Sequence, residues 1–199
     1  MSGFSSFGRQ MIVAIRAMIV FTLLLGFLYP VAVWAVGQTA FHAKANGSPL
    51  AVGSRVIGSS LIGQSFVDGK GDPLPQWFQP RPSASNYNTL ASGGSNLGPN
   101  NTTLLQQVET RRAQVAASLG VSPSSVPPDA VTASWSALDP DISPAYAYLQ
   151  VNRVAKARHL SVQQVHALVA SHIQSRTLGF LGEPYVNVLQ LNVALQALR

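Results

Sequence analysis

The stretch Ala17–Gly37, AMIVFTLLLGFLYPVAVWAVG, decides how this chain is organised. It carries no charged residue, and as a helix it would extend about 32 Å. The hydrocarbon core of a bilayer is about 30 Å thick. We therefore predict a transmembrane helix within the wider apolar region 11–37. No second stretch of this length follows, so the chain is expected to cross a membrane once.

The charges beside this stretch predict its orientation. Arg9 and Arg16 lie on its N-terminal side, whereas the first acidic residue is Asp68. Basic flanks stay on the cytoplasmic side of a membrane. We expect residues 1–10 in the cytoplasm and residues 38–199 outside it. A cleaved signal peptide is the alternative, but its apolar core is usually only about 7–15 residues long.

The composition narrows the function classes. Of 199 residues, 47% are hydrophobic and only 10% are charged, against roughly 25% charged in an average soluble domain. The formal charge of +6 is dispersed along the chain, so we expect no nucleic-acid partner. The chain has no cysteine, which excludes disulfides, thiolate zinc sites and cysteine nucleophiles.

Residues 55–199 are expected to form a mixed α/β domain after a linker at 38–54. The segment 55–66 is rich in β-branched residues with glycine breaks and predicts one or two short strands. The segment 68–101 is rich in Gly, Pro, Ser and Asn and predicts a long loop. Aromatic side chains should order this loop, namely Trp77, Phe78 and Tyr87.

Capping signals predict the helices of this domain. They lie at Thr103 with Gln106, at Gly120, at Ser143 with Pro144, at Ser161 with Gln164, and at Asn187 with Gln190. The helix that begins at Ser161 is expected to reach Ser175. Between the first two helices, Ala130–Ser134 predicts a strand.

Candidate catalytic patterns favour structural interpretations. The glycine-rich stretch Ser92–Gly98 lacks the Gly-Lys-Ser/Thr ending of a phosphate-binding loop. It reads instead as a tight loop in which Gly93, Gly94 and Gly98 adopt positive φ. The histidines do not have the His-x-x-x-His spacing of a zinc helix and read as surface residues; they are His159, His166 and His172.

A hydrolase remains an alternative. Ser134 and Ser136 have no G-x-S-x-G context and no histidine close in sequence, although a triad could assemble in space. Asp139 and Asp141 could form an acid/base pair or bind a cation. A structural role is favoured for them, because negative charge ahead of a helix N-terminus is stabilising. A membrane-tethered ligand-binding module is a further alternative.

Several motifs, in order, resemble the C subunit of the Kdp-type potassium-transporting P-type ATPase. They are Val56–Phe66 (VIGSSLIGQSF), Arg81–Ala84 (RPSA) with Tyr87-Asn88, Ser92–Asn100 (SGGSNLGPN), Val131–Ser134 (VTAS), Leu138–Pro140 (LDP), Ile142-Ser143, Gly182–Pro184 (GEP) and Val186–Leu189 (VNVL). With the N-terminal apolar stretch, the resemblance covers nearly the whole chain. The family pattern has glycine where this chain has Ala137 and histidine where it has Asp141, and Trp135 is unusual there.

The resemblance implies a four-part complex of the cell inner membrane. The partners would be a potassium-channel-like subunit, an ATP-hydrolysing P-type pump subunit and a small membrane peptide. The C subunit is expected to perform no catalysis itself. In this family it is described as a catalytic chaperone, which raises the ATP affinity of the pump subunit and supports assembly. No cofactor follows from the residues themselves. ATP and potassium would be handled by the complex, and an outer domain would not meet cytoplasmic ATP.

The resemblance and the composition together give a set of candidate interface or loop-rigidity residues. They are Gly26, Arg81, Tyr87, Asn88, Gly93, Gly94, Asn96, Gly98, Leu138, Asp139 and Asn187. Gly26 is included because a small residue in a span allows close helix contact. The loop 92–100 is expected either to face a partner subunit or to buttress the segment 55–66.

The orientation can be tested with reporter fusions. A reporter that is active only outside the cytoplasm should work when it is fused after Arg199, because the positive-inside rule places that end outside. The same reporter should be silent when it is fused before Arg9. Enzyme activity of the two fusions in intact cells is the measurement, and the reverse pattern would contradict the assignment.

Overall fold

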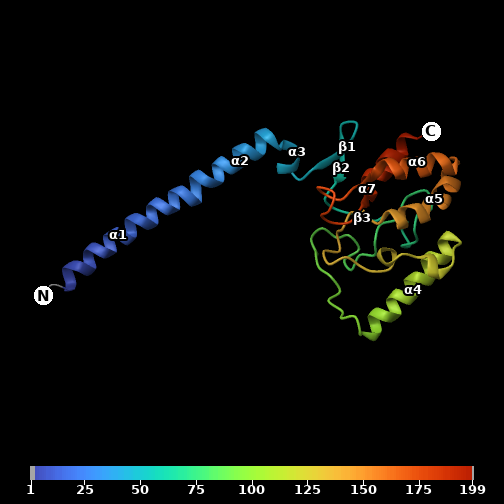
Figure 1. The fold of residues 1–199 in the computed structure, drawn as a ribbon, viewed down its shortest axis with the longest axis horizontal. Helices are drawn as coiled ribbons and strands as arrows, with labels where there is room; N and C mark the ends of the chain where they lie inside the picture. The colour runs from blue at the N-terminus through green and yellow to red at the C-terminus, as the bar shows by residue number, and fades with distance from the viewer. Residues whose placement is uncertain (1–2, 199) are drawn as a thin grey trace. The chain divides into compact units, whose positions relative to one another are not determined.

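The computed structural model describes the backbone of residues 3–198 and the side chains of residues 7–198. The chain divides at Pro49 and Leu50 into two compact units, which are described separately. The first holds a long apolar helix and the second a mixed helix and sheet domain (Figure 1). The predicted fold class, one N-terminal membrane-length helix followed by an α/β domain, is confirmed.

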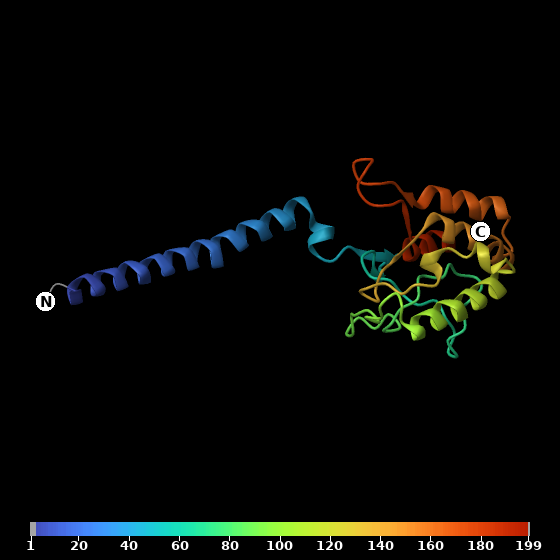
Figure 2. The same ribbon diagram turned by 60° about the horizontal axis from the view of Figure 1, so that its bottom comes forward.

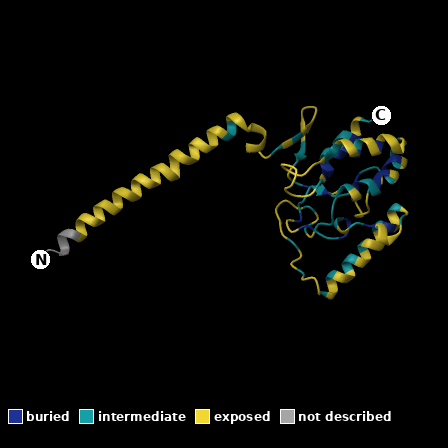
Figure 3. Ribbon diagram, in the orientation of Figure 1, coloured by how far each residue is buried: buried dark blue, intermediate teal, exposed yellow. Residues whose placement is uncertain are grey.

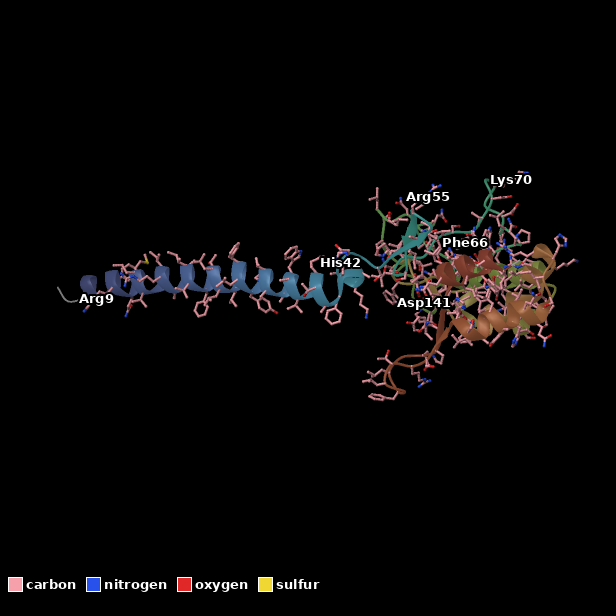
Figure 4. All side chains as sticks on the ribbon, turned by 90° about the horizontal axis from the view of Figure 1, so that it is seen from above. Arg9, His42, Arg55, Phe66, Lys70 and Asp141 are labelled. Carbon is pink, nitrogen blue, oxygen red and sulfur yellow. The ribbon has the colours of Figure 1, made fainter. Side chains whose placement is uncertain are left out.

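The N-terminal helix consists of α1 (Gly3–Leu23), the π-helical turn η1 (Leu24–Leu28) and α2 (Tyr29–Ala40). Residues Phe7–Ala40 are long and apolar enough to cross a membrane. Side chains extend from all sides of this helix into open space, and almost all are exposed (Figures 3 and 4). The π turn precedes Pro30, which has no N–H to donate; the N–H of Tyr29 bonds to the carbonyl of Leu24 instead.

The region predicted as a linker, 38–54, contains regular structure. Helix α2 continues to Ala40, and the short helix α3 (His42–Ala45) follows. The Asn46 side chain ends α3 by donating to the His42 carbonyl at 2.7 Å. Strand β1 (Pro49–Val52) then pairs with β2 (Arg55–Ser59). The sequence pattern predicted the first strand from residue 55, but strand structure begins at Pro49.

The core of the second unit lies among three helices and a small sheet. The helices are α5 (Pro144–Arg158), α6 (Val162–His172) and α7 (Val188–Ala197), which carry most of the buried residues (Figure 3). The antiparallel sheet has the order β3-β5-β4, from β3 (Asp141–Ile142), β5 (Tyr185–Asn187) and β4 (Ile173–Gln174). Val186 pairs with Ile142 on one side and Ile173 on the other, and it is fully buried.

Local capping signals predicted most helix ends correctly. Ser143 caps α5, and Ser161 with Gln164 forms a capping box on α6. Asn187 caps α7 by accepting from the N–H of Gln190. Gly120 ends α4 (Thr102–Leu119) with φ of +65°, as expected of a left-handed C-cap.

Two predicted helix boundaries and one predicted strand are wrong. The cap of α4 is Asn101, not Thr103; its side chain accepts from two backbone N–H groups. Helix α6 ends at His172 rather than near Ser175, because the next two residues pair with β5. The predicted strand 130–134 is absent: the chain forms the 3₁₀ turns η2 (Pro123–Ser125) and η3 (Pro128–Ala130), and Thr132 bonds back to the Pro128 carbonyl.

The long loop after residue 68 is ordered by side chains from α5 and α7. The Asn192 amide accepts from the Phe78 N–H at 2.9 Å and donates to the Phe78 carbonyl at 3.0 Å. The Gln150 amide makes the same pair of bonds to the backbone of Gln79, at 2.7 and 3.1 Å. The Phe78 ring is fully buried, so the aromatic anchor expected in this loop is confirmed.

Two arginines of α5 hold the residues just before this point. Arg153 donates to the Trp77 carbonyl at 3.0 Å, and Arg158 donates to the Gln76 carbonyl at 3.1 Å. The Arg158 guanidinium also lies 4.5 Å from the centre of the Trp77 ring. These side chains bond to backbone carbonyls of an irregular segment, which in a β-strand would be bonded to a neighbouring strand.

Loss of the two hydrogen bonds between the Asn192 amide and the Phe78 backbone should destabilise the fold strongly. In Asn192→Leu the volume is kept, but the buried N–H and carbonyl of Phe78 lose their partners, so the free energy of unfolding should fall by about 2–4 kcal/mol. Thermal and denaturant unfolding of the full chain in detergent measures the change. Gln196→Leu, at an exposed position of the same helix, is the control and should stay within about 0.5 kcal/mol of the parent. Equal stability of the two variants would contradict the role of this amide.

Candidate functional site

Arg81 joins two loops that are far apart in the sequence. Its Nη1 lies 2.8 Å from Oδ2 of Asp139, and its Nη2 donates to the Thr132 carbonyl at 3.4 Å. The Tyr87 hydroxyl donates to the Arg81 carbonyl at 2.7 Å. We call the contact between segments 81–94 and 132–141 the Arg81 junction. It brings together three of the predicted site residues, Arg81, Tyr87 and Asp139.

Ser83 adds a second link across the Arg81 junction. Its hydroxyl donates to the Ala137 carbonyl at 2.7 Å and accepts from the N–H groups of Ser85 and Tyr87. Asn86 and Tyr87 have φ of +52° and +59°, so this hydroxyl holds a sharply turned backbone. Sequence reasoning did not single out Ser83, although it lies within the quoted RPSA motif.

Asn187 connects the Arg81 junction to the sheet. Its Nδ2 donates to Oδ1 of Asp141 at 3.0 Å and to the Ser60 carbonyl at 2.8 Å, while its Oδ1 caps α7. Asp141 is also its strand partner in β3-β5. One side chain therefore fixes the start of a helix, a sheet register and the segment after β2.

Asp139 and Asp141 were expected to stabilise a helix N-terminus, but the structure gives Asp139 a different role. Asp139 pairs with Arg81 and accepts from the Asp141 N–H, so it stabilises the loop rather than a helix N-terminus. The carboxylate at the start of α5 is Asp129, which accepts from both the N–H and the hydroxyl of Ser143. The sequence pattern missed Asp129 because it lies 14 residues before the cap.

Burial changes the proton equilibria at the Arg81 junction. Desolvation, and then the negative charge of Asp139, raise the pKa of Asp141 to about 6, and the hydrogen bond from Asn187 opposes this shift. Desolvation and Asp139 also raise the pKa of Tyr87 well above its usual value, although Arg81 opposes this. Tyr87 is therefore a neutral hydrogen-bond donor at neutral pH.

The glycine-rich loop is hydrogen-bonded to Ser136 and lies against the backbone of Trp135. The Gly93 N–H and the Ser92 hydroxyl both donate to the Ser136 carbonyl, at 3.1 Å each. A Cβ on Gly94 would lie 3.1 Å from the carbonyl oxygen of Trp135. The expected positive φ of Gly93, Gly94 and Gly98 is wrong; the residue of this loop with φ of +54° is Asn96.

Gly63 is a glycine that sequence reasoning missed. It is buried, and its N–H donates to the Leu138 carbonyl at 2.8 Å, which brings the predicted residue Leu138 into the Arg81 junction. A Cβ at this position would lie 2.6 Å from the carbonyl oxygen of Asp139. The close approach of two backbones, rather than backbone strain, therefore requires glycine here.

The remaining predicted residues lie apart from this cluster. Asn88 accepts from the Leu90 N–H within its own exposed turn, and Asn96 and Gly98 are exposed. Gly26 lies in the π turn, where a Cβ would meet only the Thr22 methyl group at 3.8 Å. Close approach of a partner helix at Gly26 stays a prediction.

The serines of the hydrolase alternative are not joined to a base. Ser134 is buried, and the Ser136 hydroxyl accepts from the Leu138 N–H. Among residues 7–198, no hydrogen bond links either serine to a histidine, and no three His, Asp or Glu side chains are grouped to hold a metal ion. The two histidines of α6 have other contacts: the His166 ring stacks on the Tyr148 ring with centroids 4.5 Å apart, and His172 bonds to the Leu168 carbonyl. His159 is the C-cap of α5.

Comparison with known proteins assigns the chain. The family model for the c chain of the K⁺-transporting ATPase, KdpC, matches residues 11–197. The chain belongs to the KdpC family. A relative from Kineococcus radiotolerans, a potassium-transporting ATPase KdpC subunit, is 54% identical over 95% of this chain and 94% of its own length. Proteins of the same name from Streptomyces avermitilis and Mycobacterium bovis are 44% and 46% identical, each over 96% of this chain and over 94% and 99% of their own lengths.

The backbone at Ala137 favours the glycine that the resemblance led us to expect at this position. Ala137 is fully buried and has φ of +60°, in the left-handed region where glycine is favoured. A glycine would adopt this backbone freely, and alanine is accommodated there under strain. Trp135, which is also unusual under the resemblance, is 86% exposed, and nothing in the structure explains a tryptophan there.

Asp141 predicts a pH dependence of stability. Because its folded pKa of about 6 exceeds the ordinary value of 3.8, the folded state retains a proton between these limits that the unfolded state has released. Protonation of Asp141 therefore adds to the free energy of unfolding. The full stabilisation is present below the ordinary pKa, and it is lost as the pH rises through about 6. In Asp141→Asn, which still accepts from Asn187, this loss should be absent, and stability at pH 7.5 should rise by about 1 kcal/mol after allowance for partial exposure. Denaturant unfolding between pH 4 and 8 tests this, and an unchanged profile in the variant would contradict it.

Proposed function

We propose that this chain is a non-catalytic accessory subunit of an ATP-driven, high-affinity potassium uptake complex that supports assembly of that complex. The match to the KdpC family over residues 11–197 carries the proposal. It is supported by the Arg81 junction, whose polar side chains bond to backbone and to one another rather than lining up a nucleophile and a base.

The proposed location is the cell inner membrane. Residues 1–10 lie in the cytoplasm, the helix within 11–37 crosses once, and 38–199 lie outside. Arg9 and Arg16 on one side of the apolar helix support this orientation. The proposed partners are the channel-like subunit, the P-type pump subunit and the small membrane peptide. Potassium passes through those partners, because a single helix encloses no pore.

The proposal includes an effect on ATP that does not need contact with ATP. The catalytic-chaperone role attributed to this family raises the ATP affinity of the pump subunit. With its folded domain outside, this chain would exert that effect by binding one conformation of the pump and channel subunits more tightly than another. Such a difference in affinity is sufficient to shift a distant binding equilibrium.

An exposed hairpin is the surface that best suits a partner subunit. Between β4 and β5 the segment 176–184 extends away from the helices (Figure 2). Backbone hydrogen bonds between Thr177 and Leu181, and the Arg176–Glu183 ion pair, close it. Leu178 and Phe180 at its tip are 80% and 68% exposed, and Leu178 has φ of +55°. Two large apolar side chains on a defined turn offer a partner contact that the isolated chain leaves unused.

Co-purification tests this surface and the function together. A tagged chain in mild detergent should bring down the channel and pump subunits. Replacing both Leu178 and Phe180 with serine should reduce their recovery by about tenfold or more, since anchors of this kind each contribute over about 1 kcal/mol to binding. Leu105→Ser, at an exposed leucine of α4, should leave recovery unchanged. Failure of the parent chain to retain either subunit would contradict the function, whereas normal recovery by the double variant would contradict only the surface.

A further inference from the structure

A cleft of about 620 Å³ lies beside the Arg81 junction and shares Arg81, Ser83 and Tyr87 with it. It is bordered by the irregular segment 79–87, by the second half of α4 and by α5. Its lining includes three arginines, one from each border: Arg81, Arg111 and Arg153. Three guanidinium groups around one cleft are a high local concentration of positive charge for a chain with only 10% charged residues.

Two of these arginines have no carboxylate partner. Among the described residues the ion pairs are Arg81–Asp139 and Arg176–Glu183, so Arg111 and Arg153 are left with neutral acceptors. Arg111 donates to the Val131 carbonyl at 3.2 Å. Arg153 donates to the Trp77 carbonyl and to Oε1 of Gln150. The acidic residue that lines the cleft is the exposed Asp72.

Burial of these charges is only partly compensated. Desolvation lowers the pKa of both Arg111 and Arg153, which reflects the cost of holding a cation away from water. The Nε atoms of Arg81 and Arg153 are buried without a hydrogen-bond partner. A buried guanidinium is normally matched by a carboxylate or a phosphate group, to which it can donate two parallel hydrogen bonds. An anion in the cleft would supply the missing counter-charge.

We propose that this cleft is an oxyanion-binding site, in which Arg111 and Arg153 hold a carboxylate or phosphate group. The neighbouring Tyr87 is neutral and its hydroxyl is already bonded to the Arg81 carbonyl, so it does not oppose an anion. The carboxylate of an acidic protein segment and a free phosphate have the same recognition chemistry. The experiment below distinguishes these two sources, and the proposal does not depend on the transport function.

Arg111 is the better position for the test. Arg153 also holds the segment before Phe78, so its removal would disturb the fold. Arg111 makes one backbone hydrogen bond, and its neighbour Arg112 is exposed and lies outside the cleft. Arg111→Gln and Arg112→Gln remove the same charge from adjacent positions of α4. They therefore separate a specific site from a general effect of net charge.

The full chain in detergent is titrated by calorimetry with inorganic phosphate and, separately, with hexaglutamate, at constant ionic strength. We expect saturable binding of at least one probe, weakened about tenfold or more by Arg111→Gln and less than about twofold by Arg112→Gln, since a charge-assisted hydrogen bond carries this much binding energy. Unfolding temperatures of both variants confirm that they are folded.

Each outcome decides the proposal. Binding of phosphate alone assigns the site to a free anion, and binding of hexaglutamate alone assigns it to an acidic protein segment. Binding of both probes with the expected variant pattern supports the site for the shared oxyanion chemistry. Absence of binding by both probes, or equal weakening by the two variants, would overturn it. A variant that is unfolded is replaced by Arg111→Lys, which keeps the charge but not the paired donors and should still weaken binding.

Discussion

The second unit depends on one arrangement, in which two buried side-chain amides replace a neighbouring strand. Asn192 and Gln150 each bond to both backbone groups of one residue, Phe78 and Gln79. A buried backbone group without a partner is costly, so an irregular segment can enter a core only if its hydrogen bonds are met. With the backbone of Phe78 and Gln79 held in this way, the Phe78 ring is buried in the core. The chain then continues to Arg81, which forms its ion pair with Asp139.

Polar residues in this domain therefore have two distinct uses. Those of the Arg81 junction bond to each other and to backbone, and they hold loops that lack strands and helices of their own. Those of the neighbouring cleft include two arginines that form no ion pair within the part of the chain that the structure describes. The same residue types in the same part of the sequence thus serve stability in one place and leave binding capacity in another. The two cases differ in that Asp139 neutralises Arg81, whereas no carboxylate among the described residues pairs with Arg111 or Arg153.

The sequence predicted features that depend on neighbours within one helical turn. The apolar helix, the Ser143, Ser161 and Asn187 caps and the Gly120 end are of this kind. The errors arise where distant segments decide: β5 ends α6 by pairing with residues 173–174, and the need for glycine at position 63 comes from the Asp139 backbone. The family motifs located Arg81, Tyr87 and Asp139, but no local pattern indicates that Arg81 bonds to Asp139, 58 residues away.

The π turn before Pro30 has a consequence for how the apolar helix can pack. A π turn accommodates one more residue than an α turn, which rotates the side chains that follow by about 100° relative to those before it. A stripe of residues spaced by three and four along α1 is therefore not continued by the same spacing along α2. A neighbouring helix that follows the stripe on one half must leave it on the other. The two halves of the apolar helix thus present separate faces, and in the proposed membrane location each half would suit a different neighbouring helix.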